Sequence, residues 1–387
     1  MFKLKQDIIL FLLFLCLLSC SSNPKSPIDP KKNIFITKPE ITFNIKNLPK
    51  QINVFYLNSD IDPDSTSSLL QGITDNYYYY KEKIGYAPEL NFIDFSDNAY
   101  CMENMTLLNE SFSVGLLFNE DYSLLDNNCY QRLLKLRGLL VTKNKIMGIK
   151  DQKLREFHIS REVDITNLLD IAKNNGSMRA IIIDDSTTRD KALIEKIWNN
   201  MDGEVVSSVS SEKKISSQKL LAEILLLEQS KVRSRKLSRI IGLQIKNEPR
   251  KREDIDSIFL STSLSNARSL KPALEYNFAD NISVYLIPSW SEDEHFTDSE
   301  LDLEKVMISE MPFLLNTNTS FKETNSRNFA IGYDAYELVL LLDTSSKRDF
   351  NYFGLTGLIT NKYPSIQKKS LHAKVINGKL EYQDYSD

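Results

Sequence analysis

Residues 179–206 have the sequence RAIIIDDSTTRDKALIEKIWNNMDGEVV, and this stretch decides the fold class. Residues 180–183 are continuously apolar, as expected of a parallel strand that is buried on both faces. The spacing of the apolar residues that follow predicts an amphipathic helix over residues 189–201, and Val205 begins a second apolar run. A strand, a helix and a second strand in this order indicate a βαβ unit.

The same alternation extends over most of the chain. Further strands are predicted at residues 52–57, 90–95, 113–118, 255–260 and 282–287, and further helices at residues 165–173 and 266–276. Asn377-Gly378 is typical of the turn of a β-hairpin. Strands alternating with helices predict the α/β class, with mostly parallel sheets flanked by helices.

The composition narrows the range of functions. The chain has 387 residues, of which 42% are hydrophobic and 26% are charged, so it can form two or three folded domains. Its net charge is −4, whereas nucleic-acid-binding proteins carry an excess of basic residues. Three histidines and four cysteines leave little material for a metal cluster. We therefore expect no nucleic-acid partner and no metal site.

The N-terminus resembles a bacterial lipoprotein signal. Its apolar run over residues 8–18 is shorter than the roughly 20 residues that span a membrane. The run ends in a lipobox-like Leu-Leu-Ser-Cys sequence, so residues 1–19 would be a signal peptide and Cys20 would carry the lipid. Ser21 favours the outer membrane, with the protein facing the periplasm. The alternative is an ordinary secretory signal. Residues 20–50 hold five of the twelve prolines, which predicts an extended tether.

Two other cysteines of the mature chain can form a disulfide. Cys101 and Cys129 would lie in an oxidising compartment, where disulfides persist. The two residues can form a disulfide bridge or remain as two free buried thiols. The separation of their Cα atoms decides between these alternatives, and the sequence does not give it.

No catalytic motif is present. The sequence holds no nucleophile elbow, phosphate-binding loop, dinucleotide-binding glycine motif, zinc-protease motif or Cys-x-x-Cys pair. His158, His295 and His372 are far apart, and none lies beside another histidine or a cysteine at ligand spacing. A site formed only in the folded chain stays open, but we expect no enzyme, no catalytic residue and no cofactor.

Three polar loops each follow a predicted strand and precede a predicted helix. In open α/β sheets, ligands bind beyond the carboxyl ends of the strands, where helix N-termini offer unpaired N–H groups. Ser65, Ser186, Thr187 and Ser263 are therefore candidates for lining a ligand cleft. The alternative is that these residues only cap helices, because Ser and Thr are favoured N-cap residues.

Residues 231–254 carry the strongest concentration of charge. Nine basic residues stand against three acidic ones. Four aliphatic side chains are expected to form the buried side of a helix here: Val232, Leu237, Ile240 and Ile241. One interpretation is a solvated basic face. The other is that Arg250, Lys251 and Arg252 dock an acidic partner or the anionic cell wall.

An ordered series of segments matches a known pattern. It begins with Ser-x-x-Arg-x-x-x-Leu from Ser230 and continues through a basic cluster, Asp-Ile-Asp from Asp254, and an apolar strand. Later segments follow in the same order at residues 267–274, 310–315, 332–336 and 354–357. Together with the lipobox-like sequence, they resemble the LppC/LpoA lipoproteins. The resemblance covers about residues 160–387 well and the preceding hundred residues more weakly.

The resemblance implies a two-lobed fold similar to type I periplasmic binding proteins, each lobe a mostly parallel sheet flanked by helices. The chain would cross between the lobes three times. The first lobe would hold residues 50–157 and 313–345, and the second lobe residues 158–312 and 346–387.

The resemblance also implies a function. Family members with known roles are outer-membrane lipoproteins that activate a bifunctional class A penicillin-binding protein, a peptidoglycan synthase, and they are not enzymes. We expect the same partner here, with peptidoglycan as a further one. Two features depart from the pattern: only the predicted tether stands in place of an N-terminal helical repeat domain, and residues 57–62 replace a Pro-Leu-Ser-Gly turn. The alternative function is a lipid-anchored solute-binding protein that captures a small polar ligand between its lobes.

Overall fold

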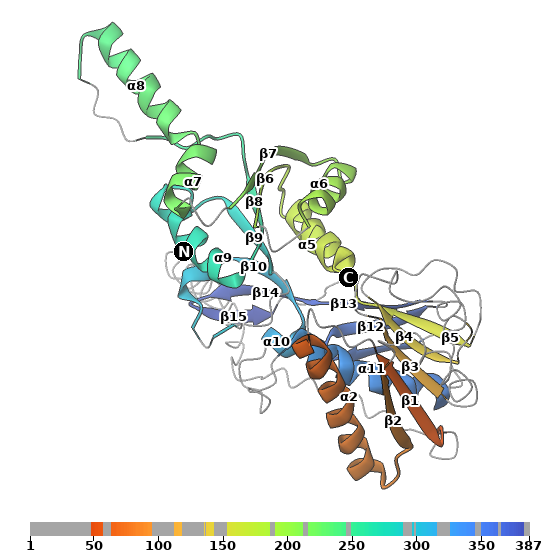
Figure 1. Ribbon diagram of the computed structural model, residues 1–387. Coiled ribbons are helices and arrows are strands. Elements are labelled where there is room, and N and C mark those ends of the chain that lie inside the picture. Colours follow the sequence, from red (N-terminus) through yellow and green to blue (C-terminus); the bar gives the residue numbers. More distant parts are fainter. Residues whose placement is uncertain are drawn as a thin grey trace, which may run out of the picture. The chain divides into compact units, whose positions relative to one another are not determined.

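The strands form two sheets in the part of the chain that the structure describes (Figure 1). The structure is a computed structural model. It describes residues 48–56, 63–94, 112–117, 135, 137–142, 153–185, 190–211, 216–244, 249–288, 296–297, 299–315, 326–344, 350–362 and 365–382. Cys20, Cys101, Cys129 and His295 lie outside these ranges, so the predicted anchor and disulfide stay predictions.

The first sheet has the strand order β11-β12-β13-β5-β4-β3-β1-β2 among the described residues. Strands β1 to β5 and β13 run parallel to their neighbours along β2-β1-β3-β4-β5-β13, and β11 and β12 are antiparallel. The strands are β1 (Gln51–Tyr56), β2 (Glu89–Asp94), β3 (Phe112–Leu117), β4 (Gly138–Thr142), β5 (Leu154–His158), β11 (Phe350–Gly354), β12 (Gly357–Lys362) and β13 (Ser365–Lys369).

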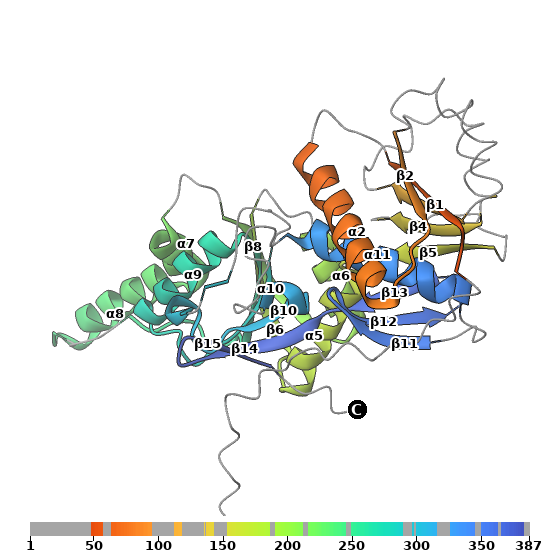
Figure 2. The ribbon, with the colours of Figure 1, turned by 90° about the horizontal axis from the view of Figure 1, so that it is seen from below.

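Two helices pack against each other beside this sheet (Figure 2). They are α2 (Pro63–Ile84) and α11 (Arg327–Thr344). Glycine allows a close approach: a Cβ atom on Gly332 would lie 2.0 Å from the carbonyl oxygen of Leu69, and one on Gly72 would lie 2.1 Å from that of Phe329. The hydroxyl of Tyr80 donates to Oε1 of Glu337 across the same interface, at 2.8 Å.

The second sheet has the strand order β15-β14-β10-β9-β8-β6-β7 in the described part of the chain. Strands β7, β6, β8, β9 and β10 are parallel, and β14 and β15 form an antiparallel hairpin at the edge. Asn377 and Gly378 both have positive φ in its turn, which confirms the predicted hairpin. The strands are β6 (Arg179–Asp184), β7 (Glu204–Ser210), β8 (Ser257–Thr262), β9 (Ser283–Pro288), β10 (Met307–Glu310), β14 (Leu371–Ile376) and β15 (Lys379–Tyr382).

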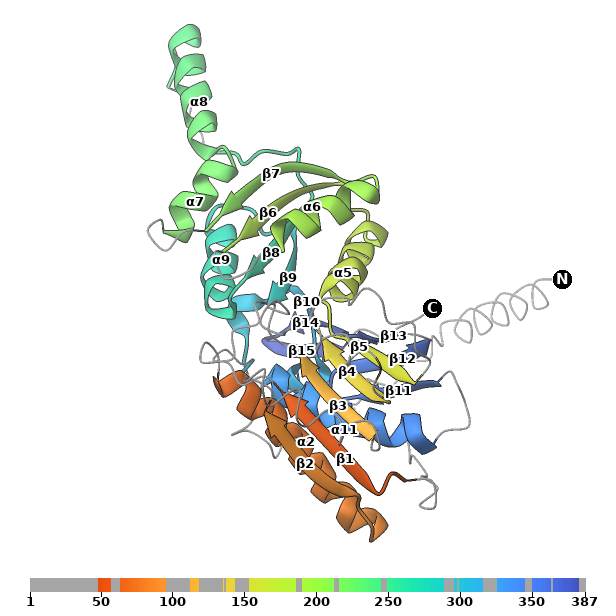
Figure 3. The ribbon, with the colours of Figure 1, turned by 45° about the vertical axis from the view of Figure 1, so that its right-hand side comes forward.

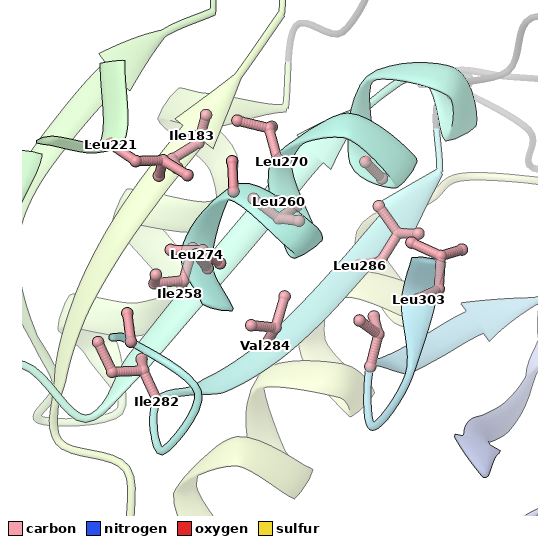
Figure 4. Close-up of a cluster of buried hydrophobic side chains, with 14 of the residues drawn as sticks. Ile183, Leu221, Ile258, Leu260, Leu270, Leu274, Ile282, Val284, Leu286 and Leu303 are labelled. Carbon is pink, nitrogen blue, oxygen red and sulfur yellow. The ribbon is translucent and has the colours of Figure 1, made fainter. Parts of the chain in front are cut away.

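Helices cover both faces of the second sheet (Figure 3). One face carries α5 (Glu162–Asn174) and α6 (Lys191–Asn200), and the other carries α7 (Ser217–Ile224) and α9 (Leu264–Tyr276). Successive side chains of β6 point to opposite faces. Ile182 packs with Trp198 of α6, while Ile183 packs with Leu221 of α7 and Leu270 of α9 (Figure 4). The apolar run 180–183 is therefore buried on both sides, as predicted. The remaining described helices are α8 (Leu227–Ile241), η3 (Leu301–Leu303) and α10 (Pro312–Leu315).

The chain passes between the sheets after β5, after β10 and after β13. We expected the third passage near residue 345, with residues 346–387 in the second lobe. That expectation is wrong for residues 350–369, because β13 pairs with β5 and extends the first sheet through β11 and β12. The third passage lies at Ser370, and only β14 and β15 return to the second sheet. Below, the first lobe is the first sheet with α2 and α11, and the second lobe is the second sheet with α5 to α9.

Candidate functional site

Ser263 is the predicted cleft residue whose side chain the structure describes. Its hydroxyl accepts a hydrogen bond from the backbone N–H of Asn266 at 3.3 Å, which caps the N-terminus of α9. Its own backbone N–H donates to Oδ2 of Asp185 at 2.6 Å. The alternative role as a helix cap therefore applies to Ser263. The other three predicted side chains lie outside the described set: Ser65, which belongs to α2, Ser186 and Thr187.

The neighbouring polar groups at the carboxyl ends of β6 and β7 are also engaged within the second lobe. The hydroxyl of Ser210 donates to Oδ1 of Asp184 at 2.7 Å. The side-chain amide of Asn266 donates to the hydroxyl of Ser211 at 2.7 Å. These contacts connect the ends of β6 and β7 with each other and with α9, and they stabilise this edge of the sheet. Ligands of open α/β sheets bind at the same edge, beyond the carboxyl ends of the strands.

Two surface pockets lie elsewhere in the second lobe. One is bordered by Tyr285 and Met307, and the other by Ser216 and Tyr276. None of the strand-end residues described above lines either pocket. Neither pocket therefore supports the predicted ligand cleft.

Buried ionic contacts join the two lobes where the chain passes between them. The ammonium of Lys368 in β13 donates to Oδ2 of Asp164 in α5 at 2.5 Å, and the backbone N–H of Ser370 donates to Oδ1 at 2.8 Å. At the second passage, Arg327 at the start of α11 pairs with Glu310 at the end of β10, and both side chains are buried. Each contact connects an element of the first lobe with an element of the second.

A third cation, which is partly buried, lies beside the first passage. Arg161 pairs with Asp190 at 2.8 Å and donates to the carbonyl oxygen of Pro288. Burial lowers the pKa of Arg161 from its ordinary value. Sequence reasoning missed this residue because nothing in its local pattern distinguishes it from a surface arginine.

The segments that carry the family resemblance meet one another in the folded chain. Asp334 accepts hydrogen bonds from the backbone N–H groups of Leu355 at 2.9 Å and Thr356 at 2.7 Å. The backbone N–H of Phe313 donates to the carbonyl oxygen of Leu355 at 3.2 Å. Segments 310–315, 332–336 and 354–357 are thus in contact, and their shared role is structural. An aspartate within a mostly apolar helix was the available sequence signal.

Helix α8 differs from every other described helix of the second lobe, because it extends beyond the sheet instead of covering it (Figures 1 and 3). Its apolar residues were expected to be buried, and this is wrong. Ile240 is 80% exposed and Leu237 and Ile241 are about half exposed. The periodicity identified the helix correctly, but no part of the described fold covers its second half.

The three candidate docking residues lie in the segment between α8 and β8, and they differ in exposure and in contacts. Arg252 is largely buried and forms a bidentate pair with Asp254. Its Nε donates to Oδ1 and its Nη2 donates to Oδ2, both at 2.6 Å. This contact lowers the pKa of Asp254 to about 2. Lys251 donates to the side chain of Asn281. Arg250 is exposed, and its backbone N–H donates to the hydroxyl of Ser230 in α8 at 2.9 Å.

No arrangement for catalysis emerges among the described residues. His158 lies in β5 of the first sheet and His372 in β14 of the second sheet. Within the described ranges, no group of three histidine, cysteine or acidic side chains is placed to hold a metal ion. In the same ranges, no helix is both long and apolar enough to cross a membrane. Among the features described above, the exposed helix α8 therefore remains as the candidate functional surface.

Comparison with known sequences gives relatives of one kind. Penicillin-binding protein activator LpoA of Aliivibrio fischeri is 26% identical over 170 residues, which cover 40% of this chain and 28% of the relative. The protein of the same name from Photobacterium profundum is 24% identical over 156 residues, covering 37% of this chain and 25% of the relative. The matches thus span about a quarter of the length of these curated relatives.

Comparison with solved structures supports the fold. The LpoA C-domain from Haemophilus influenzae, described as a regulator of PBP1A, superposes with a TM-score of 0.57 at 13% identity, over 86% of this chain and 100% of that domain. A "putative branched-chain amino acid ABC transporter" structure from Chromobacterium violaceum also gives a TM-score of 0.57, at 14% identity, over 84% of this chain and all of that one. The two-lobed α/β fold similar to periplasmic binding proteins is thus confirmed.

The family is settled by a family model. The model described as "LppC putative lipoprotein" matches residues 156–369, which is more than half of the chain and includes α8, the first two passages between the lobes and the segments that meet around Asp334. The chain belongs to the LppC family.

Proposed function

We propose that the protein is an outer-membrane lipoprotein that binds a bifunctional class A penicillin-binding protein and activates peptidoglycan synthesis by contact. The observation that carries this proposal is the match to the LppC family, whose curated relatives are named penicillin-binding protein activators. An exposed basic and aliphatic helix on the second lobe supports a role in binding another macromolecule.

The positions and contacts of the candidate polar residues support a non-catalytic role. The candidate strand-end groups form hydrogen bonds within the lobe, and the two described histidines belong to different sheets. The protein then acts by changing the activity of the synthase, and it turns over no substrate itself.

Reconstituted peptidoglycan synthesis tests the proposal. The purified class A penicillin-binding protein of the source bacterium is supplied with lipid II, and glycan polymerisation and cross-linking are followed with and without the full-length protein in detergent. We expect at least a two-fold, saturable rise in the rate and no product from the protein alone. A monofunctional class B penicillin-binding protein is the control and should not respond. Unchanged synthesis at saturating protein, or turnover by the protein alone, would contradict the proposal.

The location is tested at the proposed lipid-attachment residue. Replacing Cys20 with Ala should abolish incorporation of labelled palmitate and release the protein from the outer-membrane fraction, because the thiol is the acceptor of the lipid. Replacing the neighbouring Ser22 with Ala is the control and should leave labelling intact. Labelled palmitate on the Cys20→Ala protein would contradict the anchor.

Solute binding is the second candidate function. The fold likeness to an ABC transporter protein favours it, since such folds hold ligands between their lobes. The hydrogen bonds that engage Asp184, Asp185 and Ser263 weigh against it. Calorimetric titration with a panel of amino acids would distinguish the two functions, because a solute-binding protein should show saturable heat with one of them.

A further inference from the structure

Helix α8 begins as a packed helix and ends as an exposed one. Leu227 and Ser230 in its first turn are buried. The backbone N–H of Arg252 donates to the carbonyl oxygen of Leu225 just before the helix, at 3.0 Å, and that of Arg250 donates to Ser230. Residues 250–252 therefore fix the first turn of α8 to the lobe, and the second half of the helix projects beyond it.

The side of α8 that is buried at its base becomes aliphatic and exposed toward its end. Positions 227, 230, 234, 237 and 241 follow one another at spacings of three and four, so they lie along one side of the helix. Ile240 borders this side, and Leu243, 67% exposed, follows Gly242, which ends the helix in a left-handed conformation. Leu237, Ile240 and Ile241 present an aliphatic surface at the spacing of a helix that inserts into a groove.

Positive charge lies mainly on the opposite side of the helix from this aliphatic surface, because Arg235, Lys236 and Arg239 follow Val232 at spacings of three, four and seven. From Leu227 to Ile241 the helix carries five basic residues and one acidic residue, Glu228, whereas the whole chain has a net charge of −4. Lys231 pairs with Glu228 within the helix. Arg235, Lys236 and Arg239 are exposed toward its end. A complementary partner encloses the end of the helix, with an apolar wall against its aliphatic side and carboxylates against its basic side.

We propose that the exposed end of α8 docks the synthase, whose groove encloses it with an apolar wall against Leu237, Ile240 and Ile241 and with carboxylates against Arg235, Lys236 and Arg239. We call these six residues the α8 tip. This inference rests on the proposed function and names the contact through which it acts. It moves the docking surface from residues 250–252, two of which are engaged within the fold, to the helix that those residues support.

A protein groove fits the α8 tip better than a lipid bilayer. Helices that lie in a membrane interface bury an apolar face along their length and use Trp, Phe and Leu to do so. From Leu227 to Leu243 the chain has no aromatic residue, and apart from Val232 its exposed aliphatic residues lie in and just after the last turns of α8. Arginine is enriched where protein interfaces are strongest, and α8 carries three.

Two matched sets of variants test the inference on the full-length protein in detergent. The aliphatic variant is Leu237→Ser, Ile240→Ser, Ile241→Ser, and its control is Met178→Ser, an exposed apolar residue outside α8. Binding to the immobilised class A penicillin-binding protein should weaken at least about tenfold in the aliphatic variant, because buried anchors dominate interface energies. The control should bind as the unaltered protein does. Circular dichroism and the melting temperature show whether each variant is folded.

The charge variant replaces Arg235, Lys236 and Arg239 with Gln. Its binding should weaken several-fold at low salt and less at high salt, because exposed charges act mainly on the rate of encounter and are screened by ions. Hydrogen exchange of residues 227–243 gives a second readout. We expect protection when the synthase is added and none with phosphatidylglycerol vesicles alone.

Two outcomes would overturn the docking assignment. If the aliphatic variant is folded and binds the synthase as tightly as the unaltered protein, the α8 tip is not the contact, although the proposed function stands. Protection by phosphatidylglycerol vesicles without further change on adding the synthase would assign α8 to lipid. Failure of the unaltered protein to bind the synthase would instead remove the proposed function itself.

Discussion

His372 links the stability of the protein to pH. It lies in β14 immediately after the third passage and is buried. Burial lowers its pKa to about 4, the nearby Asp164 opposes this shift and Lys369 adds to it. The unfolded chain binds the proton near pH 6.5. Protonation therefore favours unfolding, and stability is lost as the pH falls from about 6.5 toward 4.

Urea unfolding at pH 7 and pH 5 measures this effect. The unaltered protein should lose about 2 kcal/mol between these two conditions through His372. The His372→Gln protein should lose much less, since it has no proton to bind. Asp254, with its pKa near 2, titrates below this window. His158→Gln is the control and should keep the pH dependence. Equal losses in the His372→Gln and unaltered proteins would contradict the assignment.

At the scale of elements, the packing of α2 on α11 depends on glycine. Alanine at position 332 would gain about 1 kcal/mol of helix propensity. Its Cβ, however, would lie 2.0 Å from the carbonyl oxygen of Leu69, a backbone atom that can move only if the helices separate. Overpacking of this kind costs about 1–3 kcal/mol. We therefore expect Gly332→Ala to lower the free energy of unfolding by up to about 2 kcal/mol, the cost of overpacking less the gain in helix propensity.

The control for this prediction lies on the exposed side of α2. Ser67→Ala replaces an exposed helical residue and should change stability by less than about 0.5 kcal/mol. Both variants are compared by urea unfolding. A stabilised Gly332→Ala protein would show that the helices move apart readily and that propensity outweighs packing here.

The same scale shows what the sequence could predict. The helix expected at residues 189–201 is α6, Lys191–Asn200, and the strand expected at 282–287 is β9, Ser283–Pro288. Periodicity succeeds for these elements because each buries one face or both within its own lobe. It fails for α8, because an apolar stripe has the same pattern whether the fold or another molecule covers it.

Two other failures have physical causes. Strands β11 to β13 alternate like any antiparallel strands, and only the pairing of β13 with β5 assigns them to the first sheet. Ser263 has the chemistry of both a ligand contact and a helix cap, and its hydrogen bond with Asn266 decides between the two. The pairing of β13 with β5 is long-range, and no local pattern specifies it. For Ser263 the local pattern fits both roles, so only the contact formed in the folded chain decides.

For the whole molecule, the contact of Lys368 with Asp164 couples the two lobes. It joins β13 of the first sheet to α5 of the second, and both side chains are largely removed from water. Replacing Lys368 with Met would leave Asp164 with the N–H of Ser370 but without its cation. Breaking a buried pair in this way costs about 3–5 kcal/mol. The double variant Asp164→Asn, Lys368→Met should recover part of that loss.

Calorimetry distinguishes a loss of coupling from a general loss of stability. Lys271→Met is the matched control, because Lys271 is also a buried lysine but pairs with Glu275 in the same helix of one lobe. The unaltered protein and the control should each unfold in one transition, although the control melts at a lower temperature. Lys368→Met should separate the unfolding of the two lobes, so that the calorimetric enthalpy exceeds the van't Hoff enthalpy. A single transition in Lys368→Met, lowered only as far as in the control, would mean that the remaining contacts at the passages, including Arg327 with Glu310, suffice to hold the lobes together.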